Sequence, residues 1–146
     1  MKPATLHAIT IANTDGEILS CFPVMSLLRP HLVESEFLTR IRRQQKEGYE
    51  LVFLKADSRV KSIAGLRIQE CLYSGRFLYV DDLATDESAR SQGYGGMLFD
   101  WLVEFGRKHD CEVMRLDSGV QRFAAHRFYL TKRMEISCHH FALKLK

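Results

Sequence analysis

The chain has 146 residues, of which 46% are hydrophobic and 27% are charged, and its formal net charge is +3. This composition is typical of an ordinary globular domain with a core of its own. The charge excess is small and no basic run accompanies it, so nucleic-acid binding is not expected. No apolar run approaches the roughly 18 residues of a membrane span, and the N-terminal stretch lacks the apolar core of a signal peptide. We therefore expect no membrane partner.

The four cysteines are widely spaced and form no C-x-x-C pair: Cys21, Cys71, Cys111 and Cys138. This spacing suits neither a zinc site nor a disulfide framework, and it favours free thiols in a reducing compartment. His139 and His140 follow Cys138 directly, but neighbouring residues on a strand point to opposite faces and cannot all bind one ion. The sequence thus predicts a cytoplasmic protein without a metal.

Hydrophobic periodicity in the first half predicts one strand, two helical segments and three further strands. In chain order these are a strand at residues 6–12, a helical segment at 17–28, a helix at about 34–46, and strands at 49–55, 60–71 and 77–85. Pro23 must break or kink the first helical segment, and Gly48 ends the second.

The second half predicts a helix at about residues 95–109, a strand at 113–118, a short helix at 123–131 and a last strand at 134–145. No internal repeat, low-complexity segment or linker interrupts the chain. The order of elements indicates one mixed α/β domain over residues 1–146, with much antiparallel pairing.

Residues 79–101 read YVDDLATDESARSQGYGGMLFDW: a strand, a polar loop, a glycine-rich turn and the start of a helix. Free N–H groups at a helix N-terminus attract anions, and glycines let the backbone approach a phosphate closely. The stretch therefore predicts a diphosphate site. A Walker-type loop is excluded because Met97 and Leu98, rather than Lys and Ser or Thr, follow Gly96. A dinucleotide fingerprint is excluded because no glycine lies three residues after Gly95. Glycines that serve only the turn remain the alternative.

Two motifs carry a family resemblance. The run Arg90-Ser91-Gln92-Gly93-Tyr94-Gly95 resembles the R/Q-x-x-G-x-G/A acetyl-CoA signature of GNAT-type N-acetyltransferases. Downstream, 116–118 (LDS) and 125–129 (AHRFY) are similar in order and spacing to the strand and A-x-x-F-Y helix of that family. The resemblance implies a GNAT-like fold with a central, largely antiparallel, twisted sheet flanked by helices. It also implies a bulged fourth strand that splays from the fifth to admit the acyl-pantetheine arm of acetyl-CoA.

The resemblance implies the cofactor contacts residue by residue. The phosphates of acetyl-CoA would be held by Arg90, Ser91, Gln92, Gly93, Tyr94, Gly95 and Gly96. The pantetheine arm would pair with Leu83, Ala84 and Thr85. The Leu83 amide would also polarise the thioester carbonyl.

The catalytic roles follow from the same resemblance. Tyr129 occupies the position of the tyrosine that protonates the leaving thiolate, and the alternative is that it packs on the core like Phe128. Asp82, next to Leu83, would serve the acceptor amine directly or through a water, and an ion pair without a catalytic role is the alternative. Asp81 and Asp82 are both expected to contact the acceptor, although strand alternation predicts that their side chains point to opposite faces. His31 lies in a joint that often lines the acceptor pocket, so we expect it to contact substrate.

The chain departs from the family pattern at Arg122, where an Asn is frequent, and at Arg133, where a Gly is usual. Arg133 is therefore expected in the left-handed conformation after the helix, at a cost of roughly 1 kcal/mol. His126 is expected to have a helix-surface or capping role.

The expected reaction is acetyl transfer from acetyl-CoA to a primary amine of a small molecule in a ternary complex. Residues 116–129 especially resemble bacterial small-molecule acetyltransferases. The alternatives are a protein or peptide acceptor and a non-catalytic acyl-CoA-binding regulator. The assembly is left open between a monomer and a homodimer.

Overall fold

The computed structural model describes residues 7–146. The elements are β1 (His7–Ile11), α1 (Asp15–Ser20), α2 (Phe22–Leu28), α3 (Glu34–Gln45), β2 (Glu50–Ala56), β3 (Arg59–Cys71), β4 (Gly75–Thr85), η1 (Glu87–Ala89), α4 (Tyr94–Lys108), β5 (Val113–Leu116) and α5 (Phe123–Thr131). The chain divides into two compact units, one ending at Arg115 and the other running from Leu116 to Lys146. In the described part of the chain, no helix combines the length and apolar character that a bilayer crossing requires.

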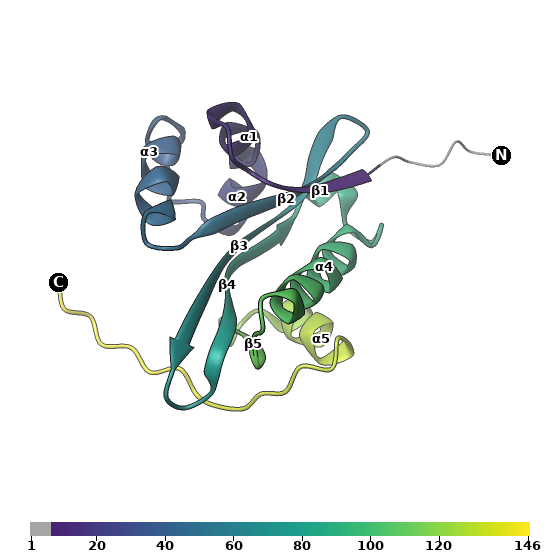
Figure 1. The fold of residues 1–146 in the computed structure, drawn as a ribbon. Coiled ribbons are helices and arrows are strands. Elements are labelled where there is room, and N and C mark those ends of the chain that lie inside the picture. The colour runs from purple at the N-terminus through teal and green to yellow at the C-terminus, as the bar shows by residue number, and fades with distance from the viewer. Residues whose placement is uncertain (1–6) are drawn as a thin grey trace. The chain divides into compact units, whose positions relative to one another are not determined.

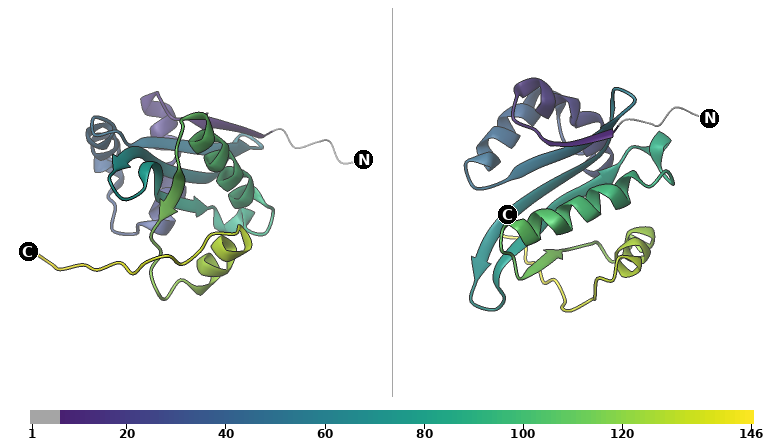
Figure 2. Two further views of the ribbon diagram at one scale, coloured as in Figure 1. Left: turned by 60° about the horizontal axis from the view of Figure 1, so that its bottom comes forward. Right: turned by 45° about the vertical axis from the view of Figure 1, so that its right-hand side comes forward.

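The first unit is built on a sheet with the strand order β1-β2-β3-β4-β5 (Figures 1 and 2). The pairs β1–β2, β2–β3 and β3–β4 are antiparallel, as predicted. Leu6, the first residue of the predicted N-terminal strand, lies outside the described residues. In β2 the run from Leu51 to Leu54 is buried throughout, because helices cover both faces of the sheet at this strand.

The helices α1, α2 and α3 lie on one face of the sheet, and α4 lies on the other (Figure 1). On the α1–α3 side, Ile18, Phe37 and Ile41 pack with Leu51 of β2 in one buried cluster. On the opposite side, a smaller cluster includes Leu54, Ala56, Ala89 and Tyr94. The apolar stripes that the sequence predicted therefore hold the helices against the sheet.

The predicted helical segment at residues 17–28 consists of two helices, α1 and α2, that meet at Cys21. Pro23 lies in the first turn of α2 and does not interrupt a helix interior. Proline is tolerated there because the first N–H groups of a helix have no partner within it.

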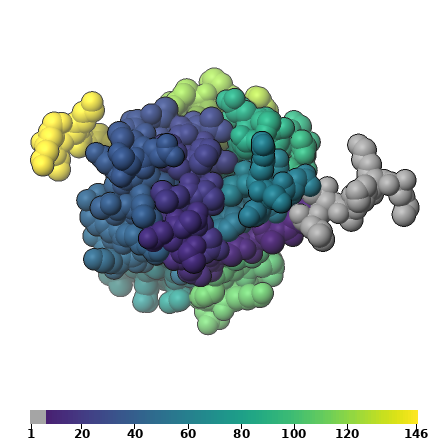
Figure 3. Space-filling model, turned by 90° about the horizontal axis from the view of Figure 1, so that it is seen from above, coloured from purple at the N-terminus to yellow at the C-terminus, as the bar shows by residue number. Residues whose placement is uncertain are grey.

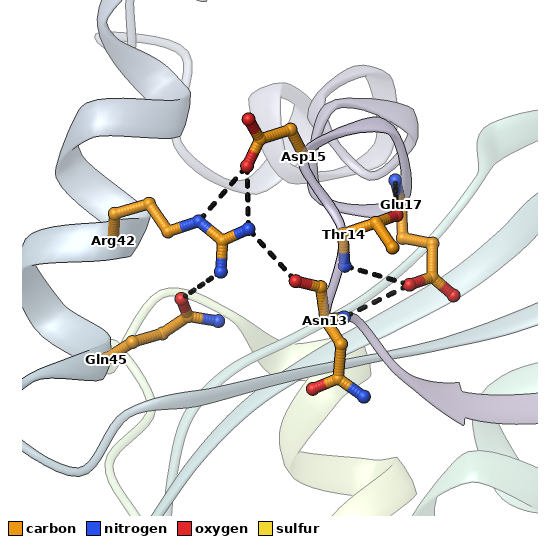
Figure 4. Close-up of polar contacts among 6 residues, drawn as sticks. All are labelled: Asn13, Thr14, Asp15, Glu17, Arg42 and Gln45. Atoms are coloured by element: carbon orange, nitrogen blue, oxygen red, sulfur yellow. Dashed lines mark hydrogen bonds and ion pairs between the residues drawn. The ribbon is translucent and has the colours of Figure 1, made fainter.

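Arg42 of α3 ties that helix to the start of α1 (Figure 4). Its guanidinium donates to Asp15 Oδ1 at 2.6 Å and to the Asn13 carbonyl at 2.9 Å. It also donates to the Gln45 side chain at 2.9 Å, while Thr14 caps α1. These contacts fix the helical layer that Figure 3 shows in purple and blue on one face of the first unit.

The strand β4 contains a bulge at Asp81. In the register with β3, Gly65 is opposite Asp82 but Leu66 is opposite Val80, so Asp81 is an additional residue. The bulge implied by the family resemblance is therefore present. The prediction that Asp81 and Asp82 point to opposite faces is wrong, because the additional residue interrupts the alternation and both line the same pocket.

The second unit contains α5, with the bounds predicted from the sequence. Arg133, just past this helix, has φ +67°, the predicted left-handed conformation. The predicted strand at residues 134–145 is wrong, since this segment has no secondary structure and Phe141 is 90% exposed. Its alternating apolar pattern suits a strand, but a strand also needs a hydrogen-bonded neighbour, which the described residues of this unit do not supply.

Candidate functional site

The glycine-rich turn lies between β4 and α4. After η1 the backbone reverses through Ser91, with φ +68°, and Gly93, with φ +85°, before α4 begins at Tyr94. The first N–H groups of a helix have no partner within that helix. No side chain caps α4, so the N–H groups at its start are not satisfied by a capping residue either. The side chains of Arg90 and Gln92 flank the turn and are exposed. The arrangement offers backbone donors and the positive end of the helix dipole to an anion.

At Tyr94 and Gly95, only main-chain atoms are available to a ligand. The side chain of Tyr94 is buried against Ala89, so only its main chain is available to a ligand. A Cβ built on Gly95 would lie 3.0 Å from Oγ1 of Thr85, which shows how closely the turn approaches the end of β4. Gly96 follows in the first turn of α4 and is half-buried.

The end of β4 is fixed by its pairing with β3. Leu83, Ala84 and Thr85 are half-buried and pair with successive residues of that strand. Ser62 of β3 donates to the Ala84 carbonyl at 2.9 Å, and its hydroxyl lies 3.2 Å from that of Thr85. The residues expected to meet pantetheine are thus held in a regular strand just after the bulge.

A pocket of about 380 Å³ lies on the α2–α3 side of the bulge. This is near the lower end of the range of small-molecule sites, about 300–1,000 Å³. Its polar wall includes residues from the loop between α2 and α3, from α3 and from β4: Arg29, His31, Arg40, Gln44, Asp81 and Asp82. The structure therefore brings together the three residues that we expected to meet the acceptor, His31, Asp81 and Asp82.

Asp82 accepts hydrogen bonds on both carboxylate oxygens. Arg29 Nε donates to Oδ1 at 3.1 Å, and the Tyr49 hydroxyl donates to Oδ2 at 2.8 Å. Burial, reinforced by the neighbouring Asp82 carboxylate, raises the pKa of Tyr49 well above its ordinary value. The phenol therefore stays protonated and remains a donor to Asp82.

Asp81 is paired with a different arginine. Arg67 Nε donates to Asp81 Oδ2 at 2.9 Å, and Arg67 Nη2 donates to Gln44 at 2.9 Å. The other oxygen of Asp81 is buried and accepts no hydrogen bond from the described residues. Burial raises the pKa of Asp81, and the ion pair with Arg67 opposes that shift.

Gly65 makes room for this cluster. It pairs with Asp82 across the β3–β4 ladder. A Cβ at this position would collide with the Tyr49 hydroxyl and would lie 2.5 Å from Asp82 Oδ2. The hydrogen bond between Tyr49 and Asp82 therefore requires glycine at position 65.

The sequence did not identify Arg29, Tyr49, Arg67 or Arg40 as site residues. Two adjacent acids in a largely apolar strand indicate that cationic or hydroxyl partners exist, because buried carboxylates are rarely unpaired. The pattern does not say which of the 21 lysines and arginines those partners are. Arg29 and Asp82 are 53 residues apart, so only the fold brings them together.

Tyr129 belongs to the second unit. Its ring packs edge-on against Phe128 with 5.5 Å between ring centres. Burial raises the pKa of the phenol, and Arg122 partly offsets this. Tyr129 and His126 line a pocket of about 390 Å³ formed within this unit. His126 Nε2 lies 2.7 Å from the Gly119 carbonyl. This contact joins α5 to the loop before it, within the second unit.

Comparison with known proteins identifies the family. The model of the acetyltransferase (GNAT) family matches residues 14–134. Over 112 residues, 76% of this chain and 79% of the relative, the sequence is 37% identical to the uncharacterized N-acetyltransferase YhdJ of Bacillus subtilis (strain 168).

Two solved structures have a similar fold. One is the aminoglycoside N-acetyltransferase AAC(6')-Iy in complex with CoA, with a TM-score of 0.87, 13% identity, and coverage of 99% of this chain and 97% of that one. The other is a transcriptional regulator from Bacillus halodurans C-125, with a TM-score of 0.84, 20% identity, and coverage of 96% and 100%. The family model and the B. subtilis relative together show that this chain belongs to the GNAT acetyltransferase family and is an N-acetyltransferase.

Proposed function

We propose that the protein transfers the acetyl group of acetyl-CoA to a primary amine of a small molecule, by direct attack in a ternary complex. The observation that carries the proposal is the position of β4. Its bulge places Asp81 and Asp82 in a pocket of about 380 Å³. Three residues after Asp82, the same strand ends at Thr85, beside the glycine-rich turn.

The turn is proposed to hold the diphosphate of acetyl-CoA. Arg90 is exposed there and forms no ion pair with any residue from 7 to 146, so its charge is available to a phosphate. The N–H groups at the start of α4 add backbone donors. AAC(6')-Iy, which has the same fold, was solved in complex with CoA.

The reaction has a complete proton and bond balance. The amine nitrogen attacks the thioester carbon, and the carbonyl oxygen becomes an oxyanion to which the Leu83 amide donates. Asp82 takes the proton that the amine loses, directly or through a water. The C–S bond then breaks, the carbonyl reforms, and Tyr129 gives a proton to the thiolate. The products are the N-acetyl amine and CoA with a free thiol. Asp82 then releases its proton to solvent and Tyr129 takes one from solvent, which restores both groups.

The volume of the pocket supports a small acceptor. AAC(6')-Iy, by name, acts on aminoglycosides, which are small-molecule amines. A peptide acceptor would need an extended groove, and the acid pair instead lies in a pocket near the lower size limit for small-molecule sites.

Two measurements test the proposal. Acetyl-CoA is expected to raise the melting temperature, and S-acetylpantetheine, which lacks the diphosphate, is expected to raise it much less. A panel of small primary amines is then screened for release of the CoA thiol, with peptides that carry an unmodified lysine as the comparison.

Three results would contradict the proposal. An unchanged melting temperature with acetyl-CoA would refute the cofactor. A shift without turnover of any amine would refute acetyl transfer. Turnover confined to peptides would refute the small-molecule acceptor.

A further inference from the structure

Arg40 of α3 is a charged residue of the pocket wall whose charge has no partner. It is half-buried and lines the pocket. It forms no hydrogen bond or ion pair with any residue in the range 7–146. By contrast, Arg42 on the same helix is bound to Asp15, and Arg43 is exposed and outside the pocket.

The other charges of the site are already compensated. Arg29 is paired with Asp82, and Arg67 is paired with Asp81. With Arg40 included, the site has three guanidinium groups and two carboxylates. It therefore carries one positive charge in excess, and that charge belongs to α3, whereas both carboxylates belong to β4.

A half-buried charge that faces a pocket is stabilised best by an opposite charge brought by the ligand. We infer that the acceptor carries an anionic group, a carboxylate or a phosphate, in addition to its amine, and that Arg40 binds this group. The inference rests on the proposed function and specifies its substrate class. The anion lies at the α3 wall and the amine at the β4 wall, beside Asp82.

The same charge balance disfavours polycationic acceptors. Both carboxylates of the pocket already have a guanidinium partner, so a second ammonium group would find no free acid and would be repelled by Arg40. A positive excess near the amine also favours its neutral, nucleophilic form. An anionic group on the acceptor offsets the excess while the amine stays reactive.

The test compares acceptors that differ only in the anion. β-Alanine is compared with β-alaninamide, and phosphoethanolamine with ethanolamine, by measuring kcat/KM for acetyl-CoA-dependent thiol release. The wild-type protein is expected to prefer the anionic member of at least one pair by about tenfold or more. The pair that shows the preference distinguishes a carboxylate from a phosphate.

Variants on α3 then assign the preference to Arg40. Arg40→Gln is expected to reduce the anionic-to-neutral ratio about tenfold, and Arg40→Lys, which keeps the charge without the planar fork, to reduce it less. Arg43→Gln is the matched control on the same helix and is expected to leave the ratio unchanged. Using ratios cancels differences in intrinsic reactivity among the amines, and urea midpoints show that each variant is folded.

Two outcomes overturn the inference while leaving the proposed function intact: acetylation without preference for the anionic member, or a preference that Arg40→Gln does not change. Failure to acetylate any amine, although acetyl-CoA binds, overturns the proposed function and the inference with it.

Discussion

Asp82 depends on two donors that come from distant parts of the chain. Arg29 follows α2, and Tyr49 precedes β2. The ring of Tyr49 also lies 5.4 Å beneath the guanidinium carbon of Arg67, which holds Asp81. Tyr49 therefore contacts Asp82 directly and also contacts Arg67, the partner of Asp81. The space that its ring occupies exists only because residue 65 is glycine.

Gly65→Ala is expected to destabilise the fold by roughly 1–3 kcal/mol, because its methyl group collides with the buried Tyr49 and with Asp82. The same displacement is expected to raise KM for the acceptor and to leave the affinity for acetyl-CoA unchanged. Urea unfolding and steady-state kinetics measure the two effects. Gly16→Ala, with nothing within 4 Å of the added Cβ, is the control and is expected to be neutral or slightly stabilising. Equal stability of the two variants would show that the cluster adjusts without strain.

Tyr129→Phe is expected to lower kcat about 10²-fold or more, the usual contribution of a positioned general acid. The substitution removes only the hydroxyl, so the dissociation constant of acetyl-CoA should not change. Because burial raises the pKa of Tyr129, the phenol keeps its proton through neutral pH. Any loss of activity from its ionisation should therefore fall above pH ~10. Tyr73→Phe, at an exposed tyrosine, is the control. An unchanged kcat would remove Tyr129 from the mechanism.

At the scale of elements, the short connection from β4 to α4 combines an uncapped helix start with two residues at positive φ, Ser91 and Gly93. A left-handed conformation costs a non-glycine residue of order 1 kcal/mol, so Ser91 adds strain to this turn. Strain in a turn that presents free backbone donors is consistent with a binding role.

Gly93→Asp is expected to weaken acetyl-CoA binding about tenfold more than Gly93→Asn does. The two side chains are nearly equal in size and both tolerate the left-handed conformation, so the comparison isolates the charge placed against the diphosphate. Isothermal titration at low and high salt measures it, and salt should reduce the difference. Equal affinities of the two variants would place the phosphate site elsewhere.

Most elements could be predicted from periodicity, since α5 has the predicted bounds and the strands of the meander are those expected. The pattern could not reveal that residues 134–145 lack a partner strand, because pairing depends on what lies alongside. Hydrophobic periodicity also could not reveal the bulge at Asp81, because a single additional residue in a strand does not change the residue types of that strand in a recognisable way. Both failures concern contacts between segments rather than local preference.

At the scale of the whole molecule, the first unit contains the pocket beside Asp81 and Asp82 and the glycine turn, and the second contains Tyr129. The motif for the turn could be read from the sequence because its residues are consecutive. The pocket could not, because it combines Arg29, Arg40 and Tyr49 with β4. Local motifs thus identified the family, whereas the residues that line the pocket came together only in three dimensions.

The bulge at Asp81 also reverses which residues of β4 face which layer. Before it, Leu78 lies against α4 and Tyr79 lines the pocket on the opposite side. After it, even-numbered Asp82 lines that pocket, and odd-numbered Thr85 lies beside Gly95 of α4. In a regular strand, Thr85 would share the face of Tyr79. One inserted residue therefore changes the parity of the strand, so that a single element presents two carboxylates to the pocket on one side and directs its end toward α4 on the other.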